Sequence, residues 1–243
     1  MKAMILAAGL GSRLRPLTND RPKALVEING KTLLELTLLR LQQAGFKEII
    51  INVHHHGQQI IDFVRNRDFS DLRIEFSKED ELLDTGGGLK KASWFFEDSD
   101  FFLVHNVDVL TDLDYRQLFV RLQETNALAC LAIRQRKTQR YLLFDEQFRL
   151  CGWQNVQRAE KRLVTNETKP LTPYSFMGVQ ALSNKIFDFF PQQAKFSLIE
   201  AYLQIAEKGK QVLGLPMPQA RWLDVGKPDS LKKAKERFAD WFV

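Results

Sequence analysis

Four continuous apolar runs of strand length recur along this chain, and helical patterns fill the segments between them. The runs are Ala3–Leu6, Ile49–Val53, Phe101–Val104 and Ala127–Ile133. Apolar runs without polar alternation are typical of strands that are covered on both faces, as in a parallel sheet. Good helix formers fill 33–44, and apolar residues at helical spacing occur within 58–67. The alternation predicts an α/β fold in which helices sandwich a mostly parallel sheet.

The pattern changes near residue 140. Shorter apolar runs at 141–144 and 148–153 precede a polar stretch at 157–169, which predicts a hairpin and loop forming a small flap on the sheet. Further helices are expected at 197–208, before Gly209, and from Pro228 onward. No linker or repeat divides the chain, so we expect one domain over 1–243, with a part at 1–135 and a second part at 136–243 that ends in a helix.

Composition narrows the class of protein. The 35 Lys and Arg residues against 30 Asp and Glu residues give a net charge of +5, which favours an anionic partner. Two cysteines, Cys130 and Cys151, exclude a disulfide framework and a four-thiolate zinc site. No signal peptide pattern and no apolar run of membrane-spanning length is present. We therefore expect a cytoplasmic protein without a membrane partner.

The loop after the first apolar run carries the strongest chemical signal. It reads LAAGLGSRLRPLTNDRPK over 6–23, so Gly9 and Gly11 directly follow a strand and can bring backbone N–H groups close to a phosphate. The third glycine of a dinucleotide-binding loop would fall on Leu14, and no Gly-Lys-Ser/Thr of a P-loop follows. The loop belongs to neither of these classes.

The charge of the same loop supports binding of a small phosphate. Arg13, Arg15, Arg21 and Lys23 against Asp20 give it a net charge of +3, which is more than half of the charge of the chain. Arginine forks and lysine point charges both suit phosphate oxygens. The alternative, a proline-pinned surface loop with solvated charges, explains the glycines but not the whole string. A nucleic-acid partner is a more distant alternative, because the charge is local.

The string Gly9-x-Gly11-x-Arg13, followed by Pro16-x-Thr18 and Pro22-Lys23, resembles the signature of the sugar-1-phosphate nucleotidyltransferases. The resemblance covers almost the whole chain and implies a Rossmann-like nucleotide-binding fold. It implies that Arg13 faces the triphosphate, and that Lys23 bridges the reacting phosphates. The nucleotide-binding residues that it implies in this loop are Leu6, Ala8, Gly9, Gly11, Ser12 and Arg13.

Two aspartates are candidate ligands for Mg²⁺, the cofactor that joining two phosphate-bearing anions calls for. Asp108 follows the third apolar run, and Asp224 lies in Trp222-x-Asp224-Val-Gly226 before the last helix. Both positions match the family pattern, which implies Asp108 as catalytic together with Arg13 and Lys23. The chain departs from that pattern at Val107 and Lys227. Asp112 and Asp114 compete with Asp108, but they are expected to be helix caps or surface residues.

The base and sugar sites are less sharply defined. Three glycines at 86–88 precede the helical pattern at 90–96, so we expect exposed backbone at a helix amino end, with Gly87 and Gly88 at the nucleobase. The resemblance implies that the strand around Gly178 lines the sugar site. Asn106 is a further candidate for contact with the sugar.

The resemblance implies in-line attack of a sugar 1-phosphate on a nucleoside triphosphate, with release of pyrophosphate. A carboxylate followed by Thr-Gly-Gly-Gly favours UTP, and the likeness to short uridylyltransferases favours an N-acetylmuramate-1-phosphate-like acceptor. GTP with mannose or heptose 1-phosphate is an alternative, and a non-catalytic domain that senses nucleotide sugars is an alternative of another class. The base, the sugar, the binding order and the oligomeric state stay open at this point.

Overall fold

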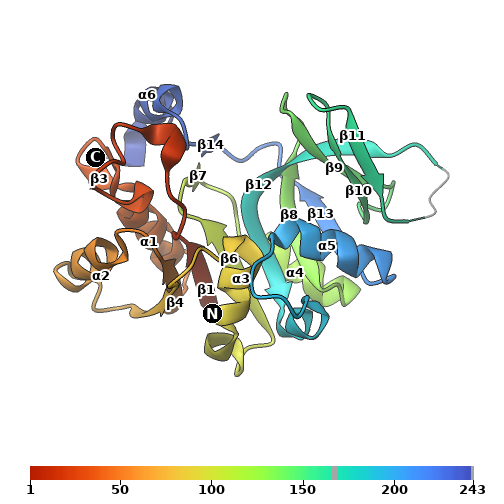
Figure 1. The fold of residues 1–243 in the computed structure, drawn as a ribbon, viewed down its shortest axis with the longest axis horizontal. Coiled ribbons are helices and arrows are strands. Elements are labelled where there is room, and N and C mark those ends of the chain that lie inside the picture. The colour runs from red at the N-terminus through yellow and green to blue at the C-terminus, as the bar shows by residue number, and fades with distance from the viewer. Residues whose placement is uncertain (166–168, 242–243) are drawn as a thin grey trace.

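A ten-stranded sheet forms the centre of the computed structural model, which describes residues 1–165 and 169–241 (Figure 1). One end of this sheet consists of four parallel strands in the order β5–β4–β1–β6, with β5 at the edge. These strands are β1 (Lys2–Leu6), β4 (Glu48–Val53), β5 (Arg73–Lys78) and β6 (Phe101–Asn106). Three of them contain predicted apolar runs, and the predicted α/β fold with a mostly parallel central sheet is confirmed.

Helices cover both faces of this sheet, as the apolar runs require. Along β1, Ala3 and Ile5 belong to one hydrophobic cluster, whereas Met4 between them belongs to the cluster on the opposite face. The first cluster is completed by helices α1 (Leu33–Gln43), α2 (Gly57–Arg65) and α4 (Arg116–Thr125). The second is completed by α3 (Asp84–Lys91) and α5 (Leu198–Glu207).

Local signals set the ends of these helices. The Thr32 hydroxyl caps α1 by accepting from the Glu35 N–H at 3.1 Å, and Ser197 caps α5 through the N–H of Ile199 at 3.2 Å. Gly45 and Gly209 follow the two helices with φ of +86° and +72°. The helices predicted at 33–44, 58–67, 197–208 and from Pro228 are confirmed, with shifts of one or two residues at their ends.

The second part of the chain extends the sheet through one long strand, β12 (Thr172–Ser183). Its carboxyl-terminal half pairs antiparallel with β6, and its amino-terminal end pairs with β9. A bulge at Gly178, with φ of +78°, lies between these halves. The remaining strands of the sheet are β8 (Ala129–Arg134), β9 (Arg140–Phe144), β10 (Leu150–Asn155), β11 (Glu160–Leu163) and β13 (Val212–Pro216).

Strands β9, β10 and β11 form the predicted flap at one end of the molecule (Figure 1). The predicted hairpin and loop are therefore confirmed within the described residues. Part of the polar stretch at 157–169 lies outside them. Within the described ranges, no helix is long and apolar enough to cross a membrane.

The carboxyl-terminal segment returns to the first loop of the chain. Strand β14 (Trp222–Asp224) pairs with β7 (Val109–Thr111), and β2 (Glu27–Ile28) pairs with β3 (Lys31–Thr32). Helix α6 (Pro228–Arg237) then packs beside the segment that follows β1 (Figure 1). Leu14, Val26 and Leu33 on one side meet Leu231 and Phe238 on the other in a third hydrophobic cluster. The two ends of the chain therefore support the same region.

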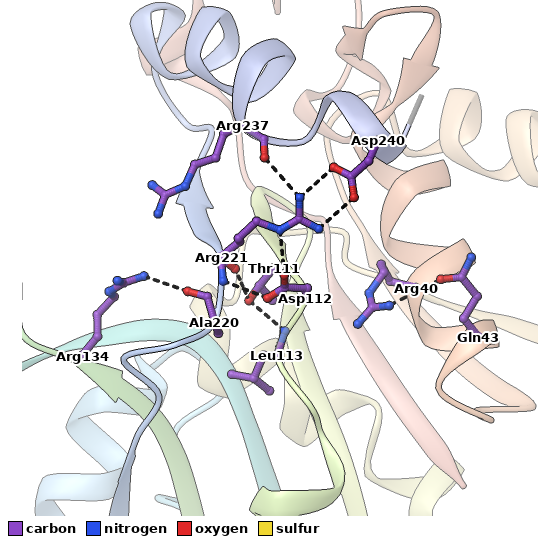
Figure 2. A network of polar contacts seen from close by, with 10 residues as sticks. All are labelled: Arg40, Gln43, Thr111, Asp112, Leu113, Arg134, Ala220, Arg221, Arg237 and Asp240. Carbon is purple, nitrogen blue, oxygen red and sulfur yellow. Dashed lines mark hydrogen bonds and ion pairs between the residues drawn. The ribbon is translucent and has the colours of Figure 1, made fainter. Parts of the chain in front are cut away.

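Arg221 fastens this carboxyl-terminal segment to the body (Figure 2). Its Nε donates to Asp112 at 2.7 Å, and its two terminal nitrogens donate to the carboxylate of Asp240 at 2.7 and 2.9 Å. These hydrogen bonds to Asp240 and Asp112 raise the pKa of Arg221 above its ordinary value. Thr111 donates to the carbonyl of Arg221, so both backbone and side chain join β7 to the start of β14.

We expect Arg221→Ala to lower Tm by about 2–4 °C, because a half-exposed network of charged hydrogen bonds contributes modestly to stability. Thermal unfolding followed by circular dichroism measures this change. Arg237→Ala is the matched control, because only its backbone carbonyl takes part in the network and survives the substitution. Equal effects of the two substitutions would contradict the role of the Arg221 side chain.

Candidate active site

The candidate site lies where the order of the parallel strands reverses. After β1 the chain adds β4 and β5 on one side of β1, and then places β6 on the other side. The crevice beyond the carboxyl ends of β1 and β6 is the position where open α/β sheets bind ligands. The Val107 N–H donates to the Leu6 carbonyl at 3.2 Å, so the glycine loop and the segment with Asp108 begin side by side.

The glycine loop turns sharply at Gly11. Its φ of +65° is in the left-handed region, and a Cβ there would approach Thr18 and Lys23 to 3.0 and 3.1 Å. Gly11 starts the short 3₁₀ turn Ser12–Leu14, and the Thr18 hydroxyl donates to its carbonyl at 2.9 Å. Because glycine has no Cβ, the loop can fold tightly against the Cβ of Lys23 at this position.

A cleft of about 210 Å³, here called the loop cleft, opens beside this turn. The Lys23 ammonium donates to Asp108 Oδ2 at 2.7 Å, and both side chains are largely buried. A lysine held at a carboxylate in such a cleft supplies positive charge next to bound phosphates. The residues lining the loop cleft are Leu6, Ala8, Gly9, Lys23, Asn52, Leu82, Asp84, Thr85, Asn106 and Asp108.

Asp224 reaches Asp108 from the opposite end of the chain. The pairing of β14 with β7 places Asp224 opposite Val109, and the Val225 N–H donates to the Asp108 carbonyl at 2.9 Å. Around the point where a Cβ on Gly226 would lie, Arg13 Nη2 is at 2.8 Å, Asp224 Oδ1 at 2.9 Å and Asp108 Oδ2 at 3.2 Å. The structure thus brings together both predicted metal ligands and one predicted phosphate ligand.

This carboxylate pair fits Mg²⁺ by its chemistry. Mg²⁺ is usually bound by one or two carboxylates, with waters and substrate phosphates as the other ligands. Among the described residues no group of three or more His, Cys, Asp or Glu side chains gathers to form a closed metal cage. Asp112, a competing candidate in the sequence, instead binds Arg221, and Asp114 binds Arg116 at 3.0 Å.

Sequence reasoning missed a buried polar relay behind the loop cleft. Asn52 Oδ1 accepts from the Ala7 N–H at 2.7 Å, and Asn52 Nδ2 donates to Glu79 Oε1 at 2.7 Å. Glu79 Oε2 in turn accepts from the Leu83 N–H at 3.0 Å. The relay fixes the start of the glycine loop relative to the segment before α3, because each buried polar atom in it has a defined partner.

The expectation of exposed backbone at Gly86–Gly88 is wrong. These glycines lie inside α3 and are buried, and the N–H groups of Gly86 and Gly87 donate to the Phe196 carbonyl. A Cβ on Gly87 would lie 2.0 Å from the Ala194 carbonyl oxygen, and one on Gly88 would lie 2.5 Å from Glu79. The glycines serve close packing of α3, and residues just before them, Leu82, Asp84 and Thr85, line the loop cleft instead.

The position of α3 also shows that the helix expected at 90–96 is wrong. Helix α3 begins at Asp84 and ends at Lys91, and a 3₁₀ turn occupies Ser93–Phe96. Asp84 has φ of +62°, and its carboxylate accepts from the Thr85 N–H at 2.6 Å. Tertiary packing against 194–196 therefore outweighs the low helix propensity of three consecutive glycines.

The two predicted sugar-side residues lie together. A Cβ on Gly178 would lie 3.1 Å from Asn106 Nδ2, so the bulge in β12 abuts the end of β6 beside the loop cleft. Burial lowers the pKa of the neighbouring His105 to about 4, and its Nδ1 lies 2.9 Å from the Asn106 carbonyl. His105 is thus an uncharged structural residue near neutral pH.

A second, larger cleft adjoins Asp224 and is here called the basic cleft. It encloses about 670 Å³, and Asp224 is its one lining carboxylate among the described residues. Burial lowers the pKa of Arg136, and the negative charge of Asp224 opposes that effect. The basic residues that line it are Arg13, Arg136, Lys137, Arg140 and Lys227. A cleft with this excess of positive charge attracts anions.

A glycine loop lies at the strand-order reversal of a Rossmann-like fold, with a lysine, an arginine and two aspartates beside it, and this arrangement is chemically suited to phosphate transfer. The family model described as nucleotidyl transferase matches residues 2–240. The chain therefore belongs to the nucleotidyl transferase family, and within it to the enzymes that act on sugar 1-phosphates.

Individual relatives agree with this assignment. An N-acetylmuramate α-1-phosphate uridylyltransferase of Caulobacter vibrioides is 32% identical over 98% of this chain and 97% of its own length. The enzyme of that name from Neisseria meningitidis is 46% identical over 49% of this chain, which is about half (52%) of the relative. HddC from Yersinia pseudotuberculosis, solved in complex with GMP-PN, has a TM-score of 0.77 and 27% identity, covering 98% of this chain and 99% of that protein.

Proposed function

We propose that this protein transfers a uridylyl group from UTP to N-acetylmuramate 1-phosphate, giving a nucleotide sugar and pyrophosphate. The convergence of Lys23, Asp108, Asp224 and Arg13 beside the glycine loop carries the proposal. Similarity over nearly the whole length to an N-acetylmuramate α-1-phosphate uridylyltransferase supports the choice of base and sugar. The carboxylate of Asp84 before Thr-Gly-Gly-Gly supports the same choice by its resemblance to uridylyltransferases.

In the proposed reaction a phosphate oxygen of the sugar 1-phosphate attacks the α-phosphorus of UTP. The new P–O bond forms as the bond from the α-phosphorus to the bridging oxygen breaks, and pyrophosphate leaves with the electron pair. The nucleophile is already an anion, so no residue needs to remove its proton. The work of the protein is to align two anions and to neutralise charge.

The residues of this chain divide that work. Lys23 places an ammonium group at the phosphates that react, and Arg13 neutralises the leaving pyrophosphate. Gly9 and Gly11 let the loop backbone approach the nucleotide. Asp108 and Asp224 would hold Mg²⁺, which supplies further positive charge to the phosphate oxygens when bound.

A substrate panel tests this proposal. Purified protein is incubated with each of UTP, GTP, CTP and dTTP against N-acetylmuramate, N-acetylglucosamine, glucose, mannose and heptose 1-phosphates, and pyrophosphate release is measured with Mg²⁺ and with chelator. We expect the highest kcat/KM for UTP with N-acetylmuramate 1-phosphate and no release without divalent metal. Binding of nucleotides without release across the panel would instead indicate a sensing domain.

GTP-dependent transfer to mannose or heptose 1-phosphate is a second candidate. The GMP-PN complex of HddC favours it, since that protein covers this chain almost completely. A higher kcat/KM for GTP with mannose or heptose 1-phosphate in the same panel would overturn the uridylyl assignment and leave the class of enzyme unchanged.

A further inference from the structure

Two arginines that are not among the predicted site residues, Arg136 and Arg140, line the basic cleft beside the flap. The Arg136 guanidinium lies 4.7 Å from the centre of the Trp222 ring, in a cation–π contact. Trp222 and Asp224 are two positions apart on β14 and therefore face the same side. Arg136 thus lies next to the carboxylate of Asp224. Arg140, at the start of β9, lines the same cleft.

These two arginines differ from Arg162, across the flap, in that neither forms an ion pair or hydrogen bond with a carboxylate, although the charge of Asp224 acts on Arg136. Among the described residues no hydrogen bond or ion pair forms at the side chain of Arg136 or of Arg140. Arg162, in contrast, pairs with Glu200 at 2.6 Å and with Glu207 at 3.2 Å. An incoming anion would therefore find Arg136 and Arg140 available, whereas Arg162 is already neutralised.

The turn that carries the pair is held in place. The Thr138 N–H donates to the Tyr141 hydroxyl at 3.0 Å, and the Val156 N–H donates to the Gln139 carbonyl at 2.8 Å. The first bond closes the turn on itself, and the second ties it to the end of β10. A turn fixed in this way presents its two cations without a large ordering cost on binding.

An apolar pocket of about 500 Å³ continues from this point under the flap. It shares Arg136, Thr138 and Arg140 with the basic cleft, so the arginines stand at the boundary between an apolar surface and a charged one. The apolar side chains on its wall include Leu142, Trp153, Phe176 and Leu203. A substituent with a methyl group and a carboxylate on one short branch would match this boundary.

We propose that Arg136 and Arg140 bind a carboxylate carried on the sugar ring, and so select an acidic sugar 1-phosphate over its neutral counterpart. The inference rests on the proposed function and extends it. N-acetylmuramate differs from N-acetylglucosamine only by an ether-linked lactyl group, which has one methyl and one carboxylate. The methyl group packs against the apolar pocket, and the carboxylate faces the two guanidinium groups.

The test compares the two sugars in the same reaction with UTP. In Arg136→Ala and in Arg140→Ala we expect kcat/KM for N-acetylmuramate 1-phosphate to fall by on the order of 10- to 100-fold, the usual effect of one lost charged hydrogen bond. We expect kcat/KM for N-acetylglucosamine 1-phosphate to change by less than about threefold. Arg136→Lys keeps the charge without the fork and should restore part of the preference.

Arg65→Ala, on the exposed end of α2, is the matched control and should leave both sugars unchanged. Equal losses on the two sugars in the Arg136 and Arg140 variants would overturn the inference, because they would assign these arginines to phosphate groups that both sugars share. Failure of the unaltered protein to turn over N-acetylmuramate 1-phosphate would overturn the proposed acceptor, and this inference with it. An assay of the unaltered protein with N-acetylmuramate 1-phosphate therefore distinguishes failure of the proposed function from failure of this inference.

Discussion

Lys23→Ala is expected to reduce kcat by about 1,000-fold or more while the protein stays folded. Lys23 is the lysine that reaches the loop cleft, and its ammonium lies 2.7 Å from Asp108. Removing a fixed cation from a phosphate-transfer site typically lowers the rate by a factor on the order of 10² to 10⁵. Pyrophosphate release with UTP and N-acetylmuramate 1-phosphate measures the loss.

A second variant separates charge from shape at this position. Lys23→Arg keeps the positive charge but not the compact ammonium, so we expect it to retain only a part of the rate. Lys47→Ala, on the exposed loop before β4, is the control and should behave as the unaltered protein. Circular dichroism and thermal unfolding of each variant show that the fold persists. Near-normal turnover by folded Lys23→Ala would exclude Lys23 from catalysis.

Asp108→Asn is expected to lower kcat by about 100- to 1,000-fold and to raise the Mg²⁺ concentration needed for half-maximal rate. The amide keeps the size of the side chain and can still accept from Lys23, but it loses the charge that a hard cation requires. Asp224→Asn should act in the same direction, because its carboxylate converges with that of Asp108 near Gly226. The measurement is pyrophosphate release over a titration with Mg²⁺.

Asp114→Asn is the matched control for this experiment. Asp114 lies close to Asp108 in the sequence, but it is half-exposed and binds Arg116 rather than the site. We expect its Mg²⁺ titration to coincide with that of the unaltered protein. A normal titration for Asp108→Asn, or a loss confined to Asp114→Asn, would contradict the placement of the metal.

The parts predicted correctly are those with local signals. The strand at 3–6 and the glycine loop are adjacent in the sequence, so one short segment predicts both the strand and the tight turn that follows it. Asp108 and Asp224 each follow an apolar run, and the structure brings their carboxylates together beside Gly226. These assignments need no knowledge of distant contacts.

The parts that sequence reasoning missed depend on distant partners. Asn52 is 45 positions from Ala7 and 27 positions from Glu79, and in its own strand it is an ordinary polar residue. Arg221 lies 109 positions from Asp112. The expected exposure of the glycines at 86–88 is wrong for the same reason, since only the fold brings 194–196 against them. Local patterns cannot reveal partners that only the tertiary structure supplies.

The packing of α6 beside the first loop has a consequence for the order of folding. Contacts in this region join residues as far apart as Lys31 and Trp241, which are 210 positions from each other. Proteins rich in such remote contacts fold slowly, because chain entropy must be lost before the contacts form. During synthesis the glycine loop emerges long before the helix that supports it. The glycine loop therefore gains the support of α6 late, and a growing chain holds the loop without this partner until α6 has been synthesised.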